Sequence, residues 1–310
     1  MAYPERQLEK ILKLYCKETG ADYISGADGW INTIKKGDLK TFVIGYKFDL
    51  NNATSSQLCD DKAALSGILK MFNIPCVEHL FIESPNGYNR TEAEIKELFN
   101  QMLKTYDELV LKPNIGSGGR NVFRCKTVEE CYELVEKLLS PRRSLCVCEF
   151  EKIKEEYRAI FLDGKIKLVY KKLRPSVVGD GFSNLESLIS QQIDKSIETD
   201  ATLNLKIVPL KNERVFVSWK HNLGLGAVAD VNIEKQKVEQ LELLAQKVAK
   251  AINITFASID IIETESNELK VLEVNSGVMM EKFSKMNDEN FEKAKQIYFE
   301  ALNKTLNIKK

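Results

Sequence analysis

Two alternating segments near the end of the chain, joined by five polar residues, predict a β-hairpin. Residues 256–263 and 269–275 each alternate polar and apolar side chains, which is the period of a strand with one buried face. With the turn centred between Ser266 and Asn267, Asp260 lies directly opposite Glu273. The same register places Ser258 opposite Asn275, Glu263 opposite Lys270, and Ile259, Ile261, Leu272 and Val274 together on the apolar face.

The polar face of this hairpin is a candidate metal site. Facing carboxylates destabilise a strand pair, so we expect a positive charge between them. Asp260, Glu273 and Asn275 offer only oxygen ligands, which suit Mg²⁺ held through few protein ligands and substrate phosphates. Two solvated carboxylates on an exposed hairpin face would give the same pattern. Motifs elsewhere in the chain are needed to distinguish this alternative from a metal site.

Composition limits the classes of function. A chain of 310 residues with 44% hydrophobic content favours about two domains or lobes. Lys plus Arg and Asp plus Glu are equal at 45 each, so no global basic field attracts nucleic acid. We find no membrane-spanning stretch and no signal-peptide core. The seven cysteines lack metal-site spacing and are typical of reduced thiols, so we expect a soluble cytoplasmic protein.

Helical and strand-like segments alternate in blocks. The clearest helix, residues 92–106, opens with a capping box of Thr91 and Glu94. Other helices are predicted over residues 5–17, 61–72, 127–139, 234–252 and 289–307, and strands over residues 41–46, 109–112, 121–125, 145–150, 156–162 and 165–172. Apart from the strand at residues 41–46, residues 18–56 are predicted to be irregular. Such blocks of helices and antiparallel hairpins favour an α+β architecture of two lobes.

A glycine-rich run at residues 116–119 joins two of these strands. Glycine lets backbone N–H groups approach phosphate oxygens closely, but the run lacks the Lys-Ser/Thr of a P-loop and the helix of a dinucleotide fold. We interpret it as a flap over a nucleotide, with an ordinary hairpin turn as the alternative. Lys112, in the apolar strand just ahead, is placed to reach the phosphates, with a lysine snorkelling from a strand end as the alternative.

Residues 148–158 join two predicted strands through a short charged link. This arrangement is typical of a hinge between lobes, where the backbone binds an adenine edge and a carboxylate further along binds ribose hydroxyls. A charged surface turn fits the residues equally well.

Taken in order, these motifs resemble the ATP-grasp superfamily. The matching residues are Asp61-Lys62, Leu111-Lys112-Pro113 with the glycine loop, Glu149 followed by Glu156-Tyr157-Arg158, and Asp260 followed by Glu273-Val274-Asn275. The match covers residues 59–281. Residues 170–181 and 221–227 look most like the branch of cyanophycin synthetase, the glutamate ligase that modifies a ribosomal protein, and bifunctional glutathione synthetase.

The resemblance implies an ATP-grasp fold, with two α+β lobes that close on ATP, and a role for each matching residue. Lys62 and Lys112 would contact phosphates, and Gly116, Ser117, Gly118 and Gly119 would form the lid. Glu149, Phe150, Glu151 and Lys152 would frame adenine, Glu156 would hold ribose, and Asp260, Glu273 and Asn275 would bind one or two Mg²⁺ ions, with Mn²⁺ as an alternative. Arg158 and Lys172, or Lys171 in its place, would face the γ-phosphate and the reacting carboxylate, and Lys220 and Asn222 the acyl-phosphate.

The sequence departs from this family in three places. Relatives usually carry Arg where Lys220 stands, and a lysine lacks the two-pronged guanidinium. Ser258 stands where the D-alanine ligase branch has arginine, so that role is not carried over. Only residues 1–58 precede the match, and we interpret them as a reduced version of the larger domain that relatives place there. Residues 59–310 would form the ATP-grasp domain, with lobes at about 59–148 and 149–310.

The implied activity is an ATP-dependent carboxylate–amine ligase that works through an acyl-phosphate, with an amino acid or a peptide as substrate. A kinase on the same scaffold and a nucleotide-binding module without turnover are the alternatives. No side-chain nucleophile is needed, in keeping with a chain that has only two histidines. The identity of the carboxylate and of the amine, and the oligomeric state, a homodimer included, stay open.

Overall fold

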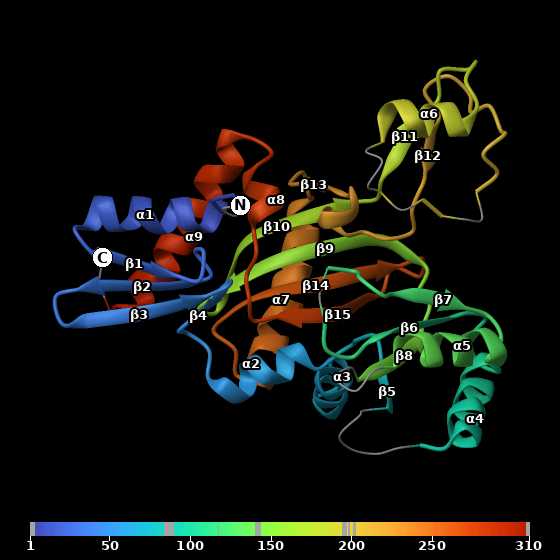
Figure 1. Cartoon of the computed structure of the whole chain (residues 1–310), viewed down its shortest axis with the longest axis horizontal. Coiled ribbons are helices and arrows are strands. Elements are labelled where there is room, and N and C mark those ends of the chain that lie inside the picture. Colours follow the sequence, from blue (N-terminus) through green and yellow to red (C-terminus); the bar gives the residue numbers. More distant parts are fainter. Residues whose placement is uncertain are drawn as a thin grey trace.

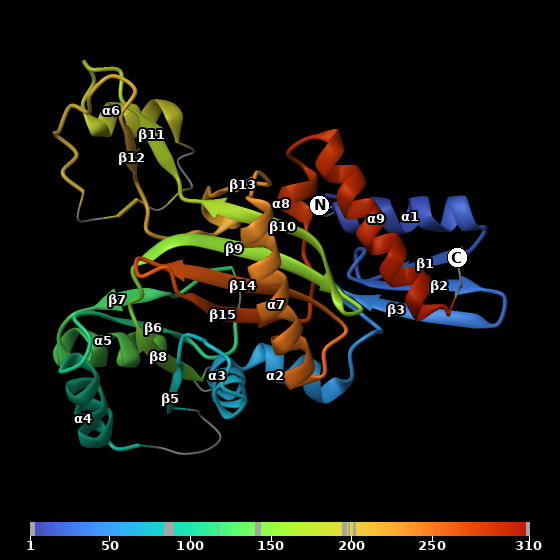
Figure 2. The ribbon, with the colours of Figure 1, turned by 180° about the vertical axis from the view of Figure 1, so that it is seen from behind.

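The fold is centred on a five-stranded antiparallel sheet with the strand order β13-β10-β9-β14-β15 (Figure 1). The computed structural model describes residues 4–83, 90–116, 118–139, 144–193, 197, 199–200 and 203–307. The strands are β9 (Ile153–Leu162), β10 (Lys165–Leu173), β13 (Val228–Asp230), β14 (Phe256–Thr264) and β15 (Leu269–Asn275). Helix α7 (Lys235–Ile252) crosses one face of this sheet (Figure 2). Its apolar stripe packs on Ala257, Ile259 and Ile261, which leaves the opposite face for the site.

A smaller antiparallel sheet lies beside the central one, with the order β5-β8-β6-β7. Its strands are β5 (Leu80–Glu83), β6 (Leu109–Pro113), β7 (Phe123–Cys125) and β8 (Leu145–Glu149). Helices α4 (Glu92–Leu103) and α5 (Val128–Leu138) share an apolar core with it. The predicted capping box at the start of α4 is confirmed, because Thr91 accepts from the backbone of Glu94 and the Glu94 carboxylate accepts from the backbone of Thr91. Helices α2 (Ala53–Asp60) and α3 (Lys62–Met71) lead into this unit.

Residues expected to be largely irregular form a four-stranded antiparallel sheet. It comprises β1 (Asp22–Gly26), β2 (Ile31–Lys36), β3 (Leu39–Ile44) and β4 (Lys47–Phe48). The alternation is disguised because Asn32 and Thr41 are buried, while Phe42 and other apolar side chains of these strands are exposed. The buried Asn32 is satisfied by Tyr23, whose hydroxyl donates to its side-chain oxygen at 2.6 Å. The expectation of irregular structure in this region was therefore wrong.

The two ends of the chain pack together around this N-terminal sheet (Figure 1). Helix α1 (Gln7–Thr19) lies against α9 (Asp288–Thr305), and the short helix α8 (Glu281–Ser284) meets the start of α1. The Glu281 carboxylate accepts hydrogen bonds from the first backbone N–H groups of α1, those of Gln7 at 2.9 Å and Leu8 at 3.0 Å. A negative group at a helix N-terminus is favourable, so Glu281 ties the C-terminal part of the fold to its beginning.

A small unit projects from the end of β10 (Figure 1). It contains β11 (Ser176–Val178), α6 (Leu185–Gln192) and β12 (Arg214–Phe216), and the chain then returns through the short 3₁₀ helix η1 (Leu223–Leu225) to β13. Val177, Leu185, Leu188 and Val217 give this unit a core of its own. Within the described part of the chain, no helix combines the length and the apolar character needed to cross a membrane.

Candidate functional site

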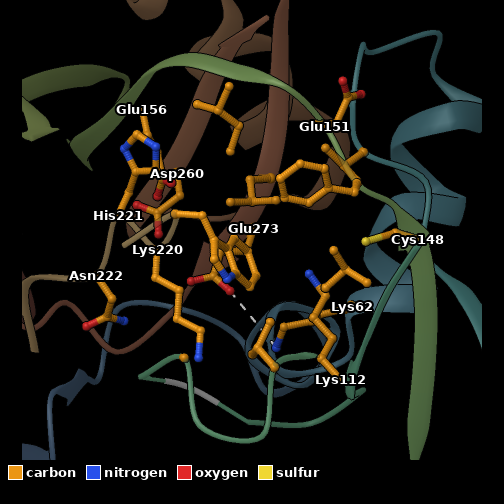
Figure 3. A pocket seen from close by; sticks show the side chains of 18 of the residues that line it. Lys62, Lys112, Cys148, Glu151, Glu156, Lys220, His221, Asn222, Asp260 and Glu273 are labelled. Atoms are coloured by element: carbon orange, nitrogen blue, oxygen red, sulfur yellow. Dashed lines mark ion pairs between the residues drawn. The ribbon is translucent and has the colours of Figure 1, made fainter. Parts of the chain in front are cut away.

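The predicted site residues converge on one cleft, which measures about 1030 Å³ when the adjoining open solvent is included. It lies between the smaller sheet and the face of the central sheet opposite α7, and Gly118 and Gly119 of the glycine loop belong to its lining. Figure 3 shows side chains that line it, among them Lys62, Asp260 and Glu273. Most of the predicted set lines it: Lys62, Lys112, Gly116, Gly118, Gly119, Glu149, Phe150, Glu151, Glu156, Arg158, Lys172, Lys220, Asn222, Asp260 and Glu273. Ser117 lies outside the described residues.

The terminal hairpin forms in the predicted register at its functional end. Asp260 pairs with Glu273, and Ser258 with Asn275, as expected. A register shift between Asp260 and Ile261 changes the rest of the ladder, so Ile261 pairs with Val271. Such a shift is typical of a β-bulge, in which an extra residue on one strand turns the following side chains to the other face.

The bulge corrects two expectations. Leu272 does not share the apolar face under α7 but lines the cleft together with Val77 and Val110, and Val271 takes its place in the core. Glu263 does not pair with Lys270, because its strand neighbour is Leu269.

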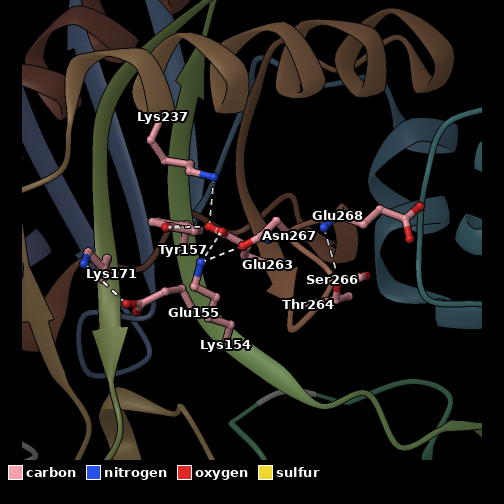
Figure 4. Close-up of polar contacts among 10 residues, drawn as sticks. All are labelled: Lys154, Glu155, Tyr157, Lys171, Lys237, Glu263, Thr264, Ser266, Asn267 and Glu268. Atoms are coloured by element: carbon pink, nitrogen blue, oxygen red, sulfur yellow. Dashed lines mark hydrogen bonds and ion pairs between the residues drawn. The ribbon is translucent and has the colours of Figure 1, made fainter.

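Glu263 instead anchors the start of α7 to the sheet (Figure 4). Its buried carboxylate accepts from Lys154 at 3.1 Å, from the Tyr157 hydroxyl at 3.1 Å, and forms an ion pair with Lys237 of α7 at 2.9 Å. Burial alone would raise the pKa of Glu263, but hydrogen bonds from Lys237 and Lys154 outweigh it and the pKa is lowered. This cluster is therefore a structural tether on the face away from the cleft.

Asp260 is the most buried charge of the site, with 1% of its surface exposed. Arg158 lies opposite it on β9 and donates two hydrogen bonds, from Nε at 2.7 Å and from Nη2 at 2.6 Å. Lys172 Nζ lies 3.0 Å from the same carboxylate. Although burial opposes ionisation, the charges of Arg158 and Lys172 hold the pKa of Asp260 well below its usual range. The expected positive charge beside the facing carboxylates is thus supplied by the protein's own side chains.

Glu156 and Lys172 form a second buried ion pair beside the first. Because Lys172 contacts both Glu156 and Asp260, these two carboxylates share one ammonium. Burial disfavours a charged lysine, but the nearby Asp260 and Glu156 carboxylates raise the pKa of Lys172. Lys171 is on the other side of the strand, 3.5 Å from Glu155, and does not line the cleft.

Glu273 is less compensated than Asp260. Its side chain is 25% exposed, and its nearest ion-pair partner among the described residues is Lys62 at 4.0 Å. Asn275 does not line the cleft itself but donates its amide to Glu273 at 3.2 Å. Lys62 also donates to the backbone carbonyl of Gly116 at 2.8 Å, which connects the glycine loop with Glu273 through the Lys62 ammonium.

The predicted hinge lies at the other end of the cleft. Burial and the neighbouring Glu151 carboxyl raise the pKa of Glu149 to about 7, and Lys270 lies 3.4 Å from Glu149. The Phe150 backbone N–H already donates to the backbone carbonyl of Glu108 at 2.9 Å. Lys152 does not line the cleft: its carbonyl accepts from the backbone of Glu265 at 3.2 Å.

His221, Asn222 and Lys220 border the end opposite the hinge. The Lys172 carbonyl lies 2.9 Å from His221 Nδ1, and burial lowers the pKa of His221 to about 4, so the imidazole is neutral. The Asn222 side chain accepts from Gly224 and opens η1, against which the glycine loop packs. At Gly119, where φ is +69°, an added Cβ would lie 3.2 Å from Leu225, so glycine suits both the backbone and the contact.

Sequence reasoning missed the apolar walls of the cleft. Val110, Val122, Cys148, Ile153, Trp219 and Leu272 form them with Phe150. Arg124 stacks over Phe150 at 4.0 Å and over Trp219 at 5.8 Å, while Glu108 accepts from its Nε at 2.7 Å. Strand alternation could have revealed Val110, which lies two residues before Lys112, and Cys148, which lies two residues before Phe150. Leu272 was hidden by the bulge.

Comparison with known proteins finds similarity to ATP-grasp proteins, as the sequence motifs indicate. Residues 211–298 match the RimK-like ATP-grasp domain. The chain is 25% identical over 266 residues to the tetrahydromethanopterin:alpha-L-glutamate ligase of Methanocaldococcus jannaschii, covering 84% of this chain and 73% of that protein. It is 27% identical over 196 residues to the cyanophycin synthetase of Trichormus variabilis, covering 56% of this chain but only 21% of that protein.

Solved structures share the fold at low sequence identity. A bifunctional glutathione synthetase from Pasteurella multocida superposes with a TM-score of 0.53 and 15% identity, covering 89% of this chain and 40% of that one. D-alanine–D-alanine ligase from Bacillus anthracis gives a TM-score of 0.52 with 16% identity, covering 83% and 68%. The predicted α+β fold and the family resemblance are both confirmed.

Proposed function

We infer that this chain, a member of the ATP-grasp superfamily with a RimK-like ATP-grasp domain, is an ATP-dependent carboxylate–amine ligase. One observation carries the proposal. Six cationic side chains and a pair of facing carboxylates line a cleft whose other end is apolar: Lys62, Lys112, Arg120, Arg158, Lys172 and Lys220 with Asp260 and Glu273. Such a cleft suits a ligand with one flat apolar end and one polyanionic end, as ATP has.

The apolar end is the proposed adenine site. Leu272, Val110 and Phe150 offer flat contacts for a base, and the carboxylates of Glu149 and Glu151 lie at the edge of this surface. Glu156 is proposed to hold the ribose hydroxyls, as the family resemblance implies. Glu156 is already paired with Lys172. In this role its carboxylate would therefore contact both the Lys172 ammonium and the ribose hydroxyls.

The residues of the hairpin suit a divalent metal ion. Asp260, Glu273 and Asn275 present carboxylate and amide oxygens, the ligands that Mg²⁺ prefers, and Mn²⁺ accepts the same set. Glu273 is partly exposed to the cleft and only weakly compensated by Lys62 at 4.0 Å, so it retains negative charge for a cation. When bound, the ion would offset charge on the phosphate oxygens.

In the proposed reaction, the substrate carboxylate attacks the γ-phosphorus of ATP, the bond to the β–γ bridging oxygen breaks, and ADP leaves. Lys62 and Lys112 hold the phosphates, and Arg158 and Lys172 hold the transferring group and the carboxylate in line. Their fixed charges stabilise the transition state without reorganisation. The amine then attacks the acyl carbon, phosphate leaves, and the amine loses a proton as the amide forms. Lys220 and Asn222 are proposed to stabilise the acyl-phosphate.

The substrates are proposed to be an amino acid or a peptide. The relatives that support this include a ligase whose name specifies alpha-L-glutamate and the cyanophycin synthetases. The chain spans about a fifth of the length of the cyanophycin synthetase of Trichormus variabilis. The cytoplasmic location stays a prediction, and the oligomeric state stays open.

We also propose a division of the chain into a short N-terminal segment, residues 1–58, and an ATP-grasp domain, residues 59–310. The position of the cleft between the smaller sheet and the central sheet supports lobes at about 59–148 and 149–310. The N-terminal sheet shares one apolar core with α9, which supports a role as a permanent part of the catalytic unit.

Phosphate release with paired amino acids and small peptides, in the presence of Mg²⁺ and ATP, tests the proposal. A ligase releases ADP only when a carboxylic acid is supplied, and hydroxylamine converts the acyl-phosphate to a hydroxamate. Lys112→Met should abolish turnover, whereas Lys10→Met, at an exposed position of α1, should not change it. A stable phosphorylated product would identify a kinase, and nucleotide binding without any turnover would identify a non-catalytic module.

A further inference from the structure

His79 is a buried histidine close enough to Lys112 and Lys62 for their charges to act on its ring. It precedes β5, whose Phe81 pairs with Cys146 of β8, and Cys146 pairs in turn with Lys112 of β6. Because side chains two residues apart on a strand share a face, His79 lies on the face of the sheet that carries Lys112. Ser66 of α3 contacts it, because the Ser66 hydroxyl accepts from the His79 backbone N–H at 3.0 Å.

The His79 ring has one satisfied and one unsatisfied nitrogen. The residue is only 4% exposed, and its Nε2 is buried without a hydrogen-bond partner among the described residues. A hydrogen bond to the Val77 backbone raises the pKa of the ring slightly, and we assign it to Nδ1 because Nε2 is the nitrogen without a partner among the described residues. Burial, together with the nearby charges of Lys112 and Lys62, lowers the pKa of His79 well below its ordinary value. The imidazole is therefore neutral, and Nε2 presents a lone pair that no donor meets.

Lys112 is the complementary case. It is 8% exposed and lines the cleft, yet its ammonium forms no hydrogen bond and no ion pair with any other described residue. Lys62, the other nearby cation, already donates to the Gly116 carbonyl at 2.8 Å. A donor without an acceptor and an acceptor without a donor thus lie on one face of the same sheet. Buried polar groups left in this state are rare and costly.

We propose that His79 is a positioning residue, whose neutral Nε2 accepts a hydrogen bond from the Lys112 ammonium when polyphosphate is bound. This inference rests on the proposed function, since it assumes that Lys112 contacts the phosphates. An ammonium has three donors, so a bond to His79 leaves two for phosphate oxygens and fixes the direction of a flexible side chain. His79 then contributes to the binding of the triphosphate and not to that of adenosine.

Two isosteric substitutions separate the nitrogens of the ring. In His79→Asn the amide takes the place of Nδ1 and keeps a donor for Val77 but loses the acceptor at Nε2. In His79→Gln the amide oxygen reaches the place of Nε2. The dissociation constant of Mg-ATP should rise about tenfold in His79→Asn, the usual effect of losing a charge-assisted hydrogen bond, and His79→Gln should restore most of the affinity. The dissociation constant of adenosine should stay the same in both.

A double-mutant cycle assigns the effect to Lys112. In a Lys112→Met background, His79→Asn should change ATP affinity less than twofold. Thr41→Val is the matched control, because Thr41 Oγ1 is also buried and has no hydrogen-bond partner in the described part of the chain, but lies in the N-terminal sheet. Its thermal midpoint can change, but its ATP affinity should not. ¹⁵N spectra of the native protein, which has only two histidines, should show the His79 Nε2 signal move upfield when ATP is added.

The outcomes are distinct. Native protein that binds no ATP overturns the proposed function and this inference with it. Native protein that binds ATP, together with a folded His79→Asn variant of equal ATP affinity, overturns only the role of His79. Equal losses of ATP and adenosine affinity also overturn it, because they indicate a general disturbance of the cleft. If neither variant folds, an Nε2 signal that does not respond to ATP overturns it.

Discussion

Asp260→Asn and Glu273→Gln each remove one of two facing carboxylates, yet the structure predicts very different costs in stability. Asp260 is buried, with Arg158 donating two bonds of 2.7 and 2.6 Å and Lys172 at 3.0 Å. Glu273 is a quarter exposed, and its ion pair with Lys62 is 4.0 Å long. Both carboxylates are proposed metal ligands, so both substitutions should weaken Mg-dependent ATP binding.

The magnitudes follow from burial. Removing one partner of a buried ion pair leaves an uncompensated charge and costs about 3–5 kcal/mol. The lower end applies to Asp260→Asn because Lys172 keeps its pair with Glu156. For a chain of this length that corresponds to a fall in thermal midpoint of roughly 5 °C. A partly exposed ion pair contributes at most about 1 kcal/mol, so Glu273→Gln should lower the midpoint by roughly 2 °C or less.

Differential scanning calorimetry at pH 7 without nucleotide measures the thermal midpoints of both variants. Calorimetric titration then measures their affinities for Mg-ATP. Glu292→Gln, on the exposed face of α9, is the matched control and should change neither. Equal thermal shifts for Asp260→Asn and Glu273→Gln would refute the difference in burial and pairing on which the argument depends. Unchanged ATP affinity in both would remove the metal assignment.

Three further predictions concern the cleft. Leu272→Ala should raise the dissociation constants of ATP and adenosine alike by roughly tenfold, the loss expected when about 1.5 kcal/mol of apolar contact is removed; calorimetry would measure both, and an effect on ATP alone would place Leu272 away from the base. The raised pKa of Glu149 should appear in ¹³C carboxyl spectra as one glutamate titrating near pH 7, and this signal should disappear in Glu149→Gln. Because the pKa of Asp260 is depressed in the folded state, its stabilising effect is complete above the unfolded pKa of about 3.9 and is lost as pH falls below it; urea midpoints between pH 6 and pH 3 should therefore fall less steeply in Asp260→Asn than in the native protein.

The hairpin illustrates what sequence can predict about this fold. Alternation in the two segments predicted the pairing of Asp260 with Glu273, because only one register buried the apolar side chains together. The bulge after Asp260 was not predictable from that pattern. It depends on the packing of Leu272 into the cleft beside Val110, and these contacts come from a sheet more than a hundred residues earlier in the chain.

The N-terminal sheet shows the opposite limit. Its buried face includes Asn32 and Thr41, while Ile31 and Phe42 are exposed, so the local pattern does not distinguish the inner from the outer face. The burial of Asn32 is possible only because Tyr23 and the turn at Gly29 supply hydrogen bonds. These hydrogen-bond partners of Asn32 come together only when the strands pair, so the local sequence does not indicate them.

The site was predicted as a set of residues but not as a set of contacts. Family resemblance identified Arg158, Lys172 and Asp260 without indicating that they bind one another. That contact follows from the strand order β10-β9-β14, which brings Arg158 directly opposite Asp260. Lys152 shows why neighbours in sequence need not share a site, since its carbonyl bonds to Glu265 outside the cleft.

The transfer of oxygen from substrate to phosphate tests the proposed reaction most directly. The carboxylic acid found by the phosphate-release screen would be labelled with ¹⁸O in its carboxylate and supplied with Mg-ATP and the amine. Attack of the carboxylate on the γ-phosphorus predicts one ¹⁸O atom in each phosphate released, detected by mass spectrometry or ³¹P spectra. Unlabelled phosphate, with both ¹⁸O atoms kept in the amide product or the recovered acid, would contradict activation of the carboxylate through an acyl-phosphate in this cleft.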